Sequence, residues 1–70
     1  MNVHEIAAAL AIDFINADST RNAESVKKSL RIEEGIDGMT ANRIVSNAEL
    51  IFNISQAIVR ACERARKSET

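Results

Sequence analysis

The sequence predicts an all-α protein built from two or three helices, and three observations support this prediction. The 70 residues contain no proline, and the only two glycines, Gly35 and Gly38, lie close together. Helix-favouring Ala, Leu, Ile, Glu, Lys and Arg fill most other positions. Apolar residues recur at steps of three and four, the spacing of a helix with a buried face. We expect one domain, residues 1–70, with a clear break at residues 33–40.

The first helix is expected at about residues 3–18. Its main apolar stripe consists of Val3, Ile6, Leu10, Phe14 and Ala17, and Ala8, Ile12 and Ile15 lie off this stripe. The polar run DSTRN, residues 18–22, is rich in capping side chains and indicates a corner or a kink. The sequence leaves open whether the first two helices are separate or form one bent helix.

The second helix is expected at about residues 21–34. Its candidates for burial are Ala23, Val26, Leu30 and Ile32. Gly35 is suited to the left-handed conformation that ends a helix, with Ile36 folding back towards Leu30. Either Asp37 or Thr40 can then cap the next helix.

The third helix is expected at about residues 40–66, and it carries more apolar surface than one neighbour can cover. With successive residues about 100° apart, its apolar arc spans roughly 220°, whereas a surface helix needs little more than ~100°. One part of the arc can face the first helix, through Val45, Ala48, Phe52 and Val59. The other part has no expected neighbour within the chain.

This surplus predicts a homodimer. A chain of this size buries only about 60% of its unfolded surface, and one cysteine, Cys62, with one histidine, His4, can form neither an internal disulfide nor a Cys/His zinc site. We therefore expect a helical hairpin that pairs with a second copy into a twofold bundle. The expected dimer interface consists of Ile44, Ile51, Ile54, Ile58, Ala61, Ile12 and Ile15.

The sequence offers no set of residues for catalysis. His4 is the only histidine, Asp13 and Asp18 are five residues apart, and no glycine-rich phosphate loop is present. We expect no catalytic residue, no metal ligand and no cofactor, and therefore a protein that is not an enzyme. No apolar stretch approaches the ~20 residues of a membrane span, and the apolar run after Glu5 lacks a basic start. A cytoplasmic protein is expected.

The segment EEGIDGMTANRIV, residues 33–45, resembles the turn and the start of the recognition helix in helix-turn-helix repressors. Gly35, Ile36, Thr40, Asn42 and Arg43 fall on the matching places. This resemblance implies DNA contacts by Thr40, Asn42, Arg43, Ser46 and Asn47. Arg31 and Glu34 depart from the pattern, because the family places small or apolar residues there. The near balance of nine basic and ten acidic residues also disfavours nucleic acid as a partner, so DNA reading is the alternative hypothesis.

The leading hypothesis is a protein-interaction module that inhibits another protein by steric occlusion. Its candidate partner-binding residues are the polar face of the third helix, Glu49, Asn53, Gln56, Arg60 and Arg64. In length, helical content and implied dimerisation, the chain is similar to the small phage-encoded quorum-sensing anti-activators. That resemblance implies a host transcription factor of the LuxR type as the target, bound at its DNA-binding domain, and a pilus-assembly ATPase as a second target.

Overall fold

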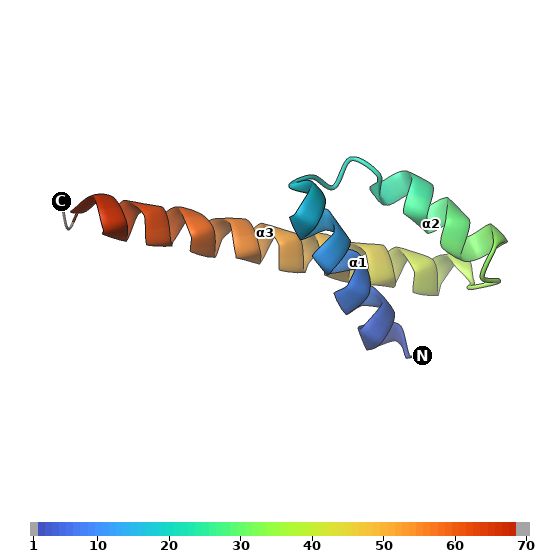
Figure 1. Cartoon of the computed structure of the whole chain (residues 1–70). Helices are drawn as coiled ribbons and strands as arrows, with labels where there is room; N and C mark the ends of the chain where they lie inside the picture. The colour runs from blue at the N-terminus through green and yellow to red at the C-terminus, as the bar shows by residue number, and fades with distance from the viewer. Residues whose placement is uncertain (1, 69–70) are drawn as a thin grey trace.

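The computed structural model describes residues 2–68 and consists of three α-helices (Figure 1). Helix α1 spans Val3–Ala17, α2 spans Ala23–Ile32 and α3 spans Gly38–Ser68. The prediction of an all-α fold is confirmed, since residues 2–68 contain helices and turns and no strand. The first two helices are separate. Helix α2 is shorter than expected at both ends, and α3 is longer at both ends.

Local hydrogen bonds explain where α1 begins and ends. The side-chain Oδ1 of Asn2 accepts the backbone N–H of Glu5 at 2.8 Å, which caps the first turn. At the other end, Asp18 adopts a left-handed conformation with a φ of 53°. Its N–H donates to the carbonyl of Ile15 and the N–H of Ser19 donates to that of Phe14, both at 3.1 Å. The polar segment at residues 18–22 therefore forms a corner, because its first residue closes α1 and turns the chain.

The turn between α2 and α3 follows the predicted chemistry. Gly35 has a φ of 66°, and the N–H of Ile36 donates to the carbonyl of Leu30 at 3.0 Å. This confirms the predicted glycine cap, in which the chain folds back over the end of the helix. Of the two candidate caps for α3, Asp37 performs the role, because its Oδ2 accepts the N–H of Thr40 at 3.1 Å.

The core lies where α1 and α2 each pack against the first part of α3, and the backbones of α1 and α2 are not neighbours. Its buried residues are Ala7, Leu10, Ala11 and Phe14 of α1, Ala23 of α2, and Ala41, Ile44, Val45 and Ala48 of α3. Half-buried Val26, Leu30 and Phe52 pack around this cluster. In the predicted main stripe of α1, Leu10 and Phe14 are buried and Val3 and Ile6 are half-buried against the core, whereas Ala17, at the end of the helix, is exposed.

Three further expectations about burial are wrong. Ile44 was expected in a dimer interface, but it is fully buried in the core of its own chain. Val59 was expected against α1, but 48% of it is exposed, because α1 ends beside Gln56, whose side chain bonds Asp18. Ile32 was a candidate for burial and is 69% exposed, because it lies at the last position of α2.

The molecule therefore divides into a head, residues 2–56, and an arm, residues 57–68. The overall dimensions are 52 × 21 × 16 Å, and the long axis follows α3 (Figure 1). Every residue of the arm is exposed. At 1.5 Å per residue, the arm extends α3 by about 18 Å beyond the head. The arm has no covering neighbour among the described residues.

Candidate protein-interaction surface

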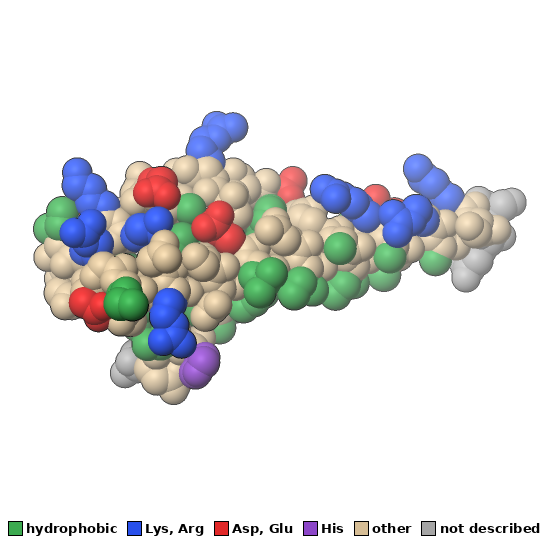
Figure 2. Space-filling view, turned by 180° about the vertical axis from the view of Figure 1, so that it is seen from behind, with side chains coloured by type: hydrophobic (Ala, Val, Ile, Leu, Met, Phe, Trp, Pro, Cys, Tyr) green, Lys and Arg blue, Asp and Glu red, His purple; other side chains and the backbone are tan. Residues whose placement is uncertain are grey.

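An apolar stripe runs along α3 from the head onto the arm. We define it as Ile51, Ile54, Ile58, Ala61 and Ala65, which follow one another at alternating steps of four and three. The three isoleucines are 41%, 51% and 58% exposed, and both alanines are exposed. Figure 2 shows hydrophobic side chains gathered along one edge of the arm, with Lys and Arg side chains along the opposite edge. Apart from Ile44, the predicted interface residues on α3 all belong to this exposed stripe.

The spacing and composition of the apolar stripe indicate how it can be covered. Alternating steps of three and four residues are those of the a and d positions in a coiled coil, which face a second helix. The side chains shrink along the stripe, from isoleucine at its start to alanine at its end. Leu50, which is 58% exposed, lies beside the start of the stripe and widens it. A helix is therefore the shape of partner that fits this surface.

The remaining predicted interface residues, Ile12 and Ile15, are on α1. They are 57% and 39% exposed. Ile12 lies on the face of α1 opposite its buried Leu10 and Phe14, whereas Ile15 lies at the edge of the buried face, one turn after buried Ala11. Both residues are exposed, as a role in an interface requires, but they are on α1 and are therefore not part of the apolar stripe.

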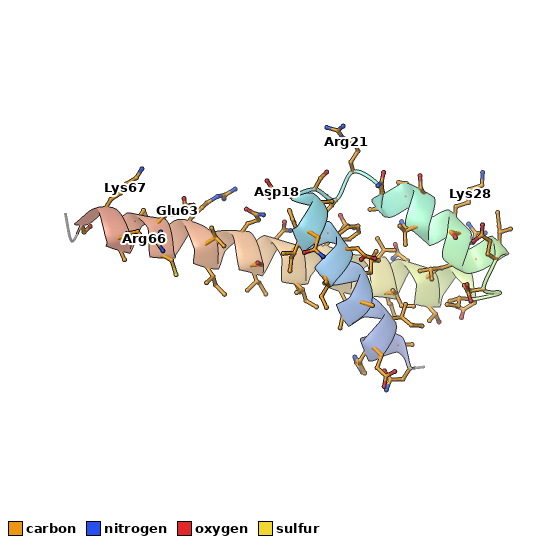
Figure 3. The ribbon with its side chains drawn as sticks, viewed as in Figure 1. Asp18, Arg21, Lys28, Glu63, Arg66 and Lys67 are labelled. Carbon is orange, nitrogen blue, oxygen red and sulfur yellow. The ribbon has the colours of Figure 1, made fainter. Side chains whose placement is uncertain are left out.

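The predicted partner-binding residues share one face of α3, but they do not share one environment. Arg60 and Arg64 are exposed on the arm, and Asn53 is exposed on the head. Glu49 and Gln56 are half-buried, and Nε2 of Gln56 donates to Oδ1 of Asp18 at 2.7 Å. Figure 3 shows Asp18 at the end of α1, beside α3. This bond gives Gln56 a structural role in holding α1 against α3. The freely presented part of the face is therefore Asn53, Arg60 and Arg64.

Charge is divided between the two regions. The head carries five basic and eight acidic residues, a net charge of −3, with His4 neutral. The arm carries four basic residues and one acidic residue, a net charge of +3. Figure 3 shows Glu63, Arg66 and Lys67 on the arm, well beyond α1 and α2. The protein is therefore a rod with opposite charges at its two ends, although its overall charge is close to zero.

The residues of the DNA-reading hypothesis are also accessible at the start of α3. Asn42, Arg43, Ser46 and Asn47 are exposed, and Thr40 is half-buried. The hydrogen bonds from the side chain and then the backbone N–H of Thr40 lower the pKa of Asp37. Its carboxylate therefore stays charged at the helix N-terminus, the place where a helix would accept a DNA phosphate. This local negative charge disfavours phosphate binding there.

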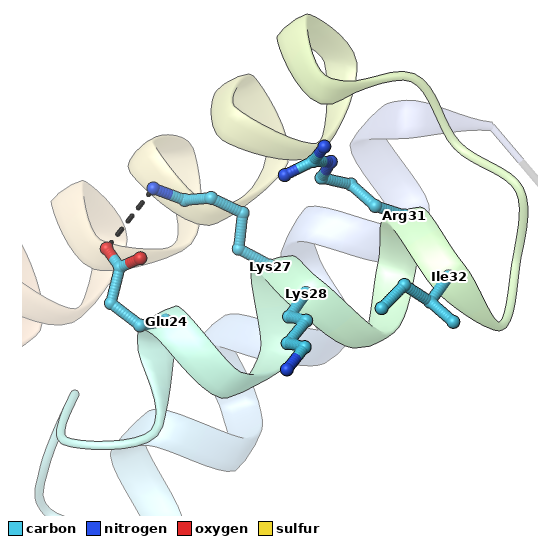
Figure 4. A pocket seen from close by; sticks show the side chains of 5 residues that line it. All are labelled: Glu24, Lys27, Lys28, Arg31 and Ile32. Atoms are coloured by element: carbon cyan, nitrogen blue, oxygen red, sulfur yellow. Dashed lines mark hydrogen bonds and ion pairs between the residues drawn. The ribbon is translucent and has the colours of Figure 1, made fainter.

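The surface hollows of the head do not form an enclosed site. The one drawn in Figure 4 is lined by Glu24, Lys27, Lys28, Arg31 and Ile32, all from α2. Within it, Nζ of Lys27 and Oε1 of Glu24 form an ion pair at 3.2 Å. Because one helix supplies the whole lining, a ligand there would stay largely in solvent.

The described residues also show no grouping that resembles a metal site or a membrane span. Among residues 2–68, no cluster of three or more His, Cys, Asp or Glu side chains could hold a metal ion. His4 and Cys62 are both exposed, on different helices. In the same range, no helix combines the length and the apolar character needed to cross a membrane.

Comparisons with protein-family models, with curated proteins and with solved structures find no match to this chain.

Two features of the surface escaped the sequence reading. The separation of charge is visible in the sequence, because α1 contains two acidic residues and no Lys or Arg, and four of nine basic residues follow position 59; the total charge concealed it. The bond between Asp18 and Gln56 joins residues 38 positions apart. No local pattern signals that contact.

Proposed function

We propose that this chain is a protein-interaction module, not an enzyme, that dimerises through the apolar stripe and inhibits another protein by steric occlusion. The observation that carries the proposal is the arm. It presents the end of the apolar stripe on one edge and arginines on the other (Figure 2). No other described part of the chain covers the arm, so both surfaces are exposed to other molecules. Exposed apolar patches on small proteins usually mark interaction sites.

The energy available from the apolar stripe is compatible with a dimer that depends on concentration. Leu50, Ile51, Ile54 and Ile58 are each about half exposed. Covering them in both copies would contribute roughly 6–12 kcal/mol, half of their full burial energy. Association costs about 4–15 kcal/mol. Because these ranges overlap, we expect the dimer to dissociate on dilution, and its mass should be measured by sedimentation at several concentrations.

The target-binding part of the proposal uses the polar face of the arm. Arg60 and Arg64 are exposed and one helical turn apart, so they can meet a pair of carboxylates on another protein. Their charges would set the choice of target and the rate of encounter more than the affinity. Steric occlusion needs no chemistry, which agrees with a surface made only of exposed helix faces.

The target to test first is a LuxR-type transcription factor, the partner implied by the resemblance to phage anti-activators. A purified regulator is bound to labelled operator DNA, and the protein is then added. We expect release of the DNA, measured by fluorescence anisotropy. The Arg60→Gln/Arg64→Gln double variant leaves the apolar stripe unchanged and the arm net positive, so it should keep the dimeric mass and release much less DNA. No release by the wild-type protein, or equal release by the variant, would contradict this proposal.

The second candidate function is DNA reading by α3, which is favoured by the exposure of Asn42, Arg43, Ser46 and Asn47. A DNA reader binds random duplex DNA at low salt and loses affinity steeply as salt rises. We expect micromolar protein to show no such binding. A salt-dependent complex that disappears in the Arg43→Ala variant would support DNA reading.

A further inference from the structure

We propose that the two copies of α3 pair in antiparallel orientation along the apolar stripe, so that each arm lies beside the head of the other copy. This inference rests on the proposed dimer and adds its geometry. Two independent observations support it, the distribution of charge and the gradient of side-chain size along the apolar stripe.

The charge distribution favours the antiparallel pair. In a parallel pair, the two arms would lie together, each with a net charge of +3, and the two heads, each −3, would do the same. In an antiparallel pair, each positive arm lies beside a negative head. Exposed charges interact over about 8–10 Å at physiological salt, which is comparable to the separation of packed helices. The repulsion between the two positive arms therefore opposes the parallel orientation, and the antiparallel orientation separates the arms.

The decrease in side-chain size along the apolar stripe also favours the antiparallel pair. In a parallel pair, each position faces itself, so Ala61 meets Ala61 and Ala65 meets Ala65, which leaves thin layers towards the tip. In an antiparallel pair, a positions face d positions. Ile51 then meets Ala61 of the other copy and Ile54 meets Ile58. Large residues placed opposite small ones fill the interface more evenly.

The head leaves room for the arm of a second copy. The residues that continue the apolar-stripe side of α3 along the head, Arg43, Asn47 and Leu50, are exposed. Helices α1 and α2 instead cover the side that contains Ala41, Val45 and Ala48. A second α3 can therefore lie along this side of the helix without displacing any buried residue.

Cysteine cross-linking tests the orientation. In a Cys62→Ala background, one protein carries Ile51→Cys and a second, distinguished by an affinity tag, carries Ala61→Cys. Each protein is first treated separately with oxidised glutathione, and the two proteins are then mixed and treated together. We expect a disulfide-linked dimer in the mixture, several-fold above either protein alone. Ile51→Cys mixed with Arg64→Cys serves as a spacing control, because position 64 lies off the apolar stripe.

The other outcomes separate this inference from the proposed dimer. Efficient cross-linking within Ile51→Cys alone and within Ala61→Cys alone would show a parallel pair, which overturns the orientation and keeps the dimer. Protein that sediments as a dimer without any cross-link would overturn pairing along the apolar stripe. A monomeric mass at all concentrations tested would overturn both the dimer and its geometry.

Discussion

The first and second halves of α3 carry similar apolar residues but differ in how far these residues are buried. In the head, Ala41, Ile44 and Ala48 are fully buried beneath α1 and α2. Past Phe52, Ile54 and Ile58 are more than half exposed. The difference lies in the neighbours, since α1 and α2 have 15 and 10 residues against the 31 of α3. An apolar face therefore predicts a covering partner, and the lengths of the other helices show how much of that face the chain itself can cover.

The largest expected effect is in the head. Ile44→Ala should reduce the free energy of unfolding by about 2–5 kcal/mol, because it removes a fully buried side chain and leaves a cavity. The matched control is Ile58→Ala on the arm, which should cost less than about 1 kcal/mol in dilute, monomeric protein. Urea unfolding at low concentration measures both. Equal losses would contradict the division into head and arm.

The second prediction concerns the apolar stripe. Ile51→Asp with Ile58→Asp should abolish the dimer, because each carboxylate would be buried without a partner in the interface. The head should remain folded, since both positions are 41% or more exposed in the single chain. We expect a monomeric mass by sedimentation and a largely helical circular dichroism spectrum. A dimer of unchanged affinity would show that the apolar stripe is not the interface.

A smaller effect on stability is expected at the turn between α2 and α3. Gly35→Ala should destabilise the protein by about 1–2 kcal/mol, because alanine resists the left-handed conformation. No atom lies within 4 Å of the added Cβ, so the loss comes from the backbone alone. Gly38→Ala is the matched control, with an ordinary contact at 3.7 Å to Nε of Arg31 and no left-handed φ. Thermal unfolding should show no loss for the control.

The smallest effect concerns pH. The hydrogen bonds of Thr40 keep the pKa of Asp37 below its ordinary value of 3.8. The charged form of Asp37 therefore adds stability above the unfolded-state pKa, and this is lost as the pH falls through the lower folded-state pKa. Asp37→Asn keeps a capping side chain and removes the charge. We expect its melting temperature to fall less between pH 6 and pH 2 than that of the wild type.

The helical architecture was predictable because its signals are local. The absence of proline, the three- and four-residue spacing and the glycine cap at Gly35 each depend on a few neighbouring residues. The helix ends were less predictable, since Asp18 closes α1 through a left-handed conformation that asparagine, aspartate and glycine can all adopt. Neighbouring residues do not indicate at which asparagine, aspartate or glycine the chain will turn.

The candidate surface was predictable only in part, because burial depends on distant residues. The periodicity separated the apolar arc of α3 from its polar face. It could not divide the arc between α1, α2 and solvent, which is why Ile44 and Val59 were placed wrongly. The position of Ile44 under both shorter helices and of Val59 beyond α1 follows from tertiary packing. The second copy and the target remain predictions.

The unbroken course of α3 has one further consequence. No proline or glycine interrupts it between Met39 and Ser68, so the arm cannot swivel independently of the core. Inserting one residue near Gln56 would rotate everything beyond it by about 100° and twist the second half of the apolar stripe out of line with the first. Inserting seven residues would nearly restore the alignment and lengthen the rod by about 10 Å. The number of residues in α3 therefore sets both the direction that the surfaces of the arm face and their distance from the head.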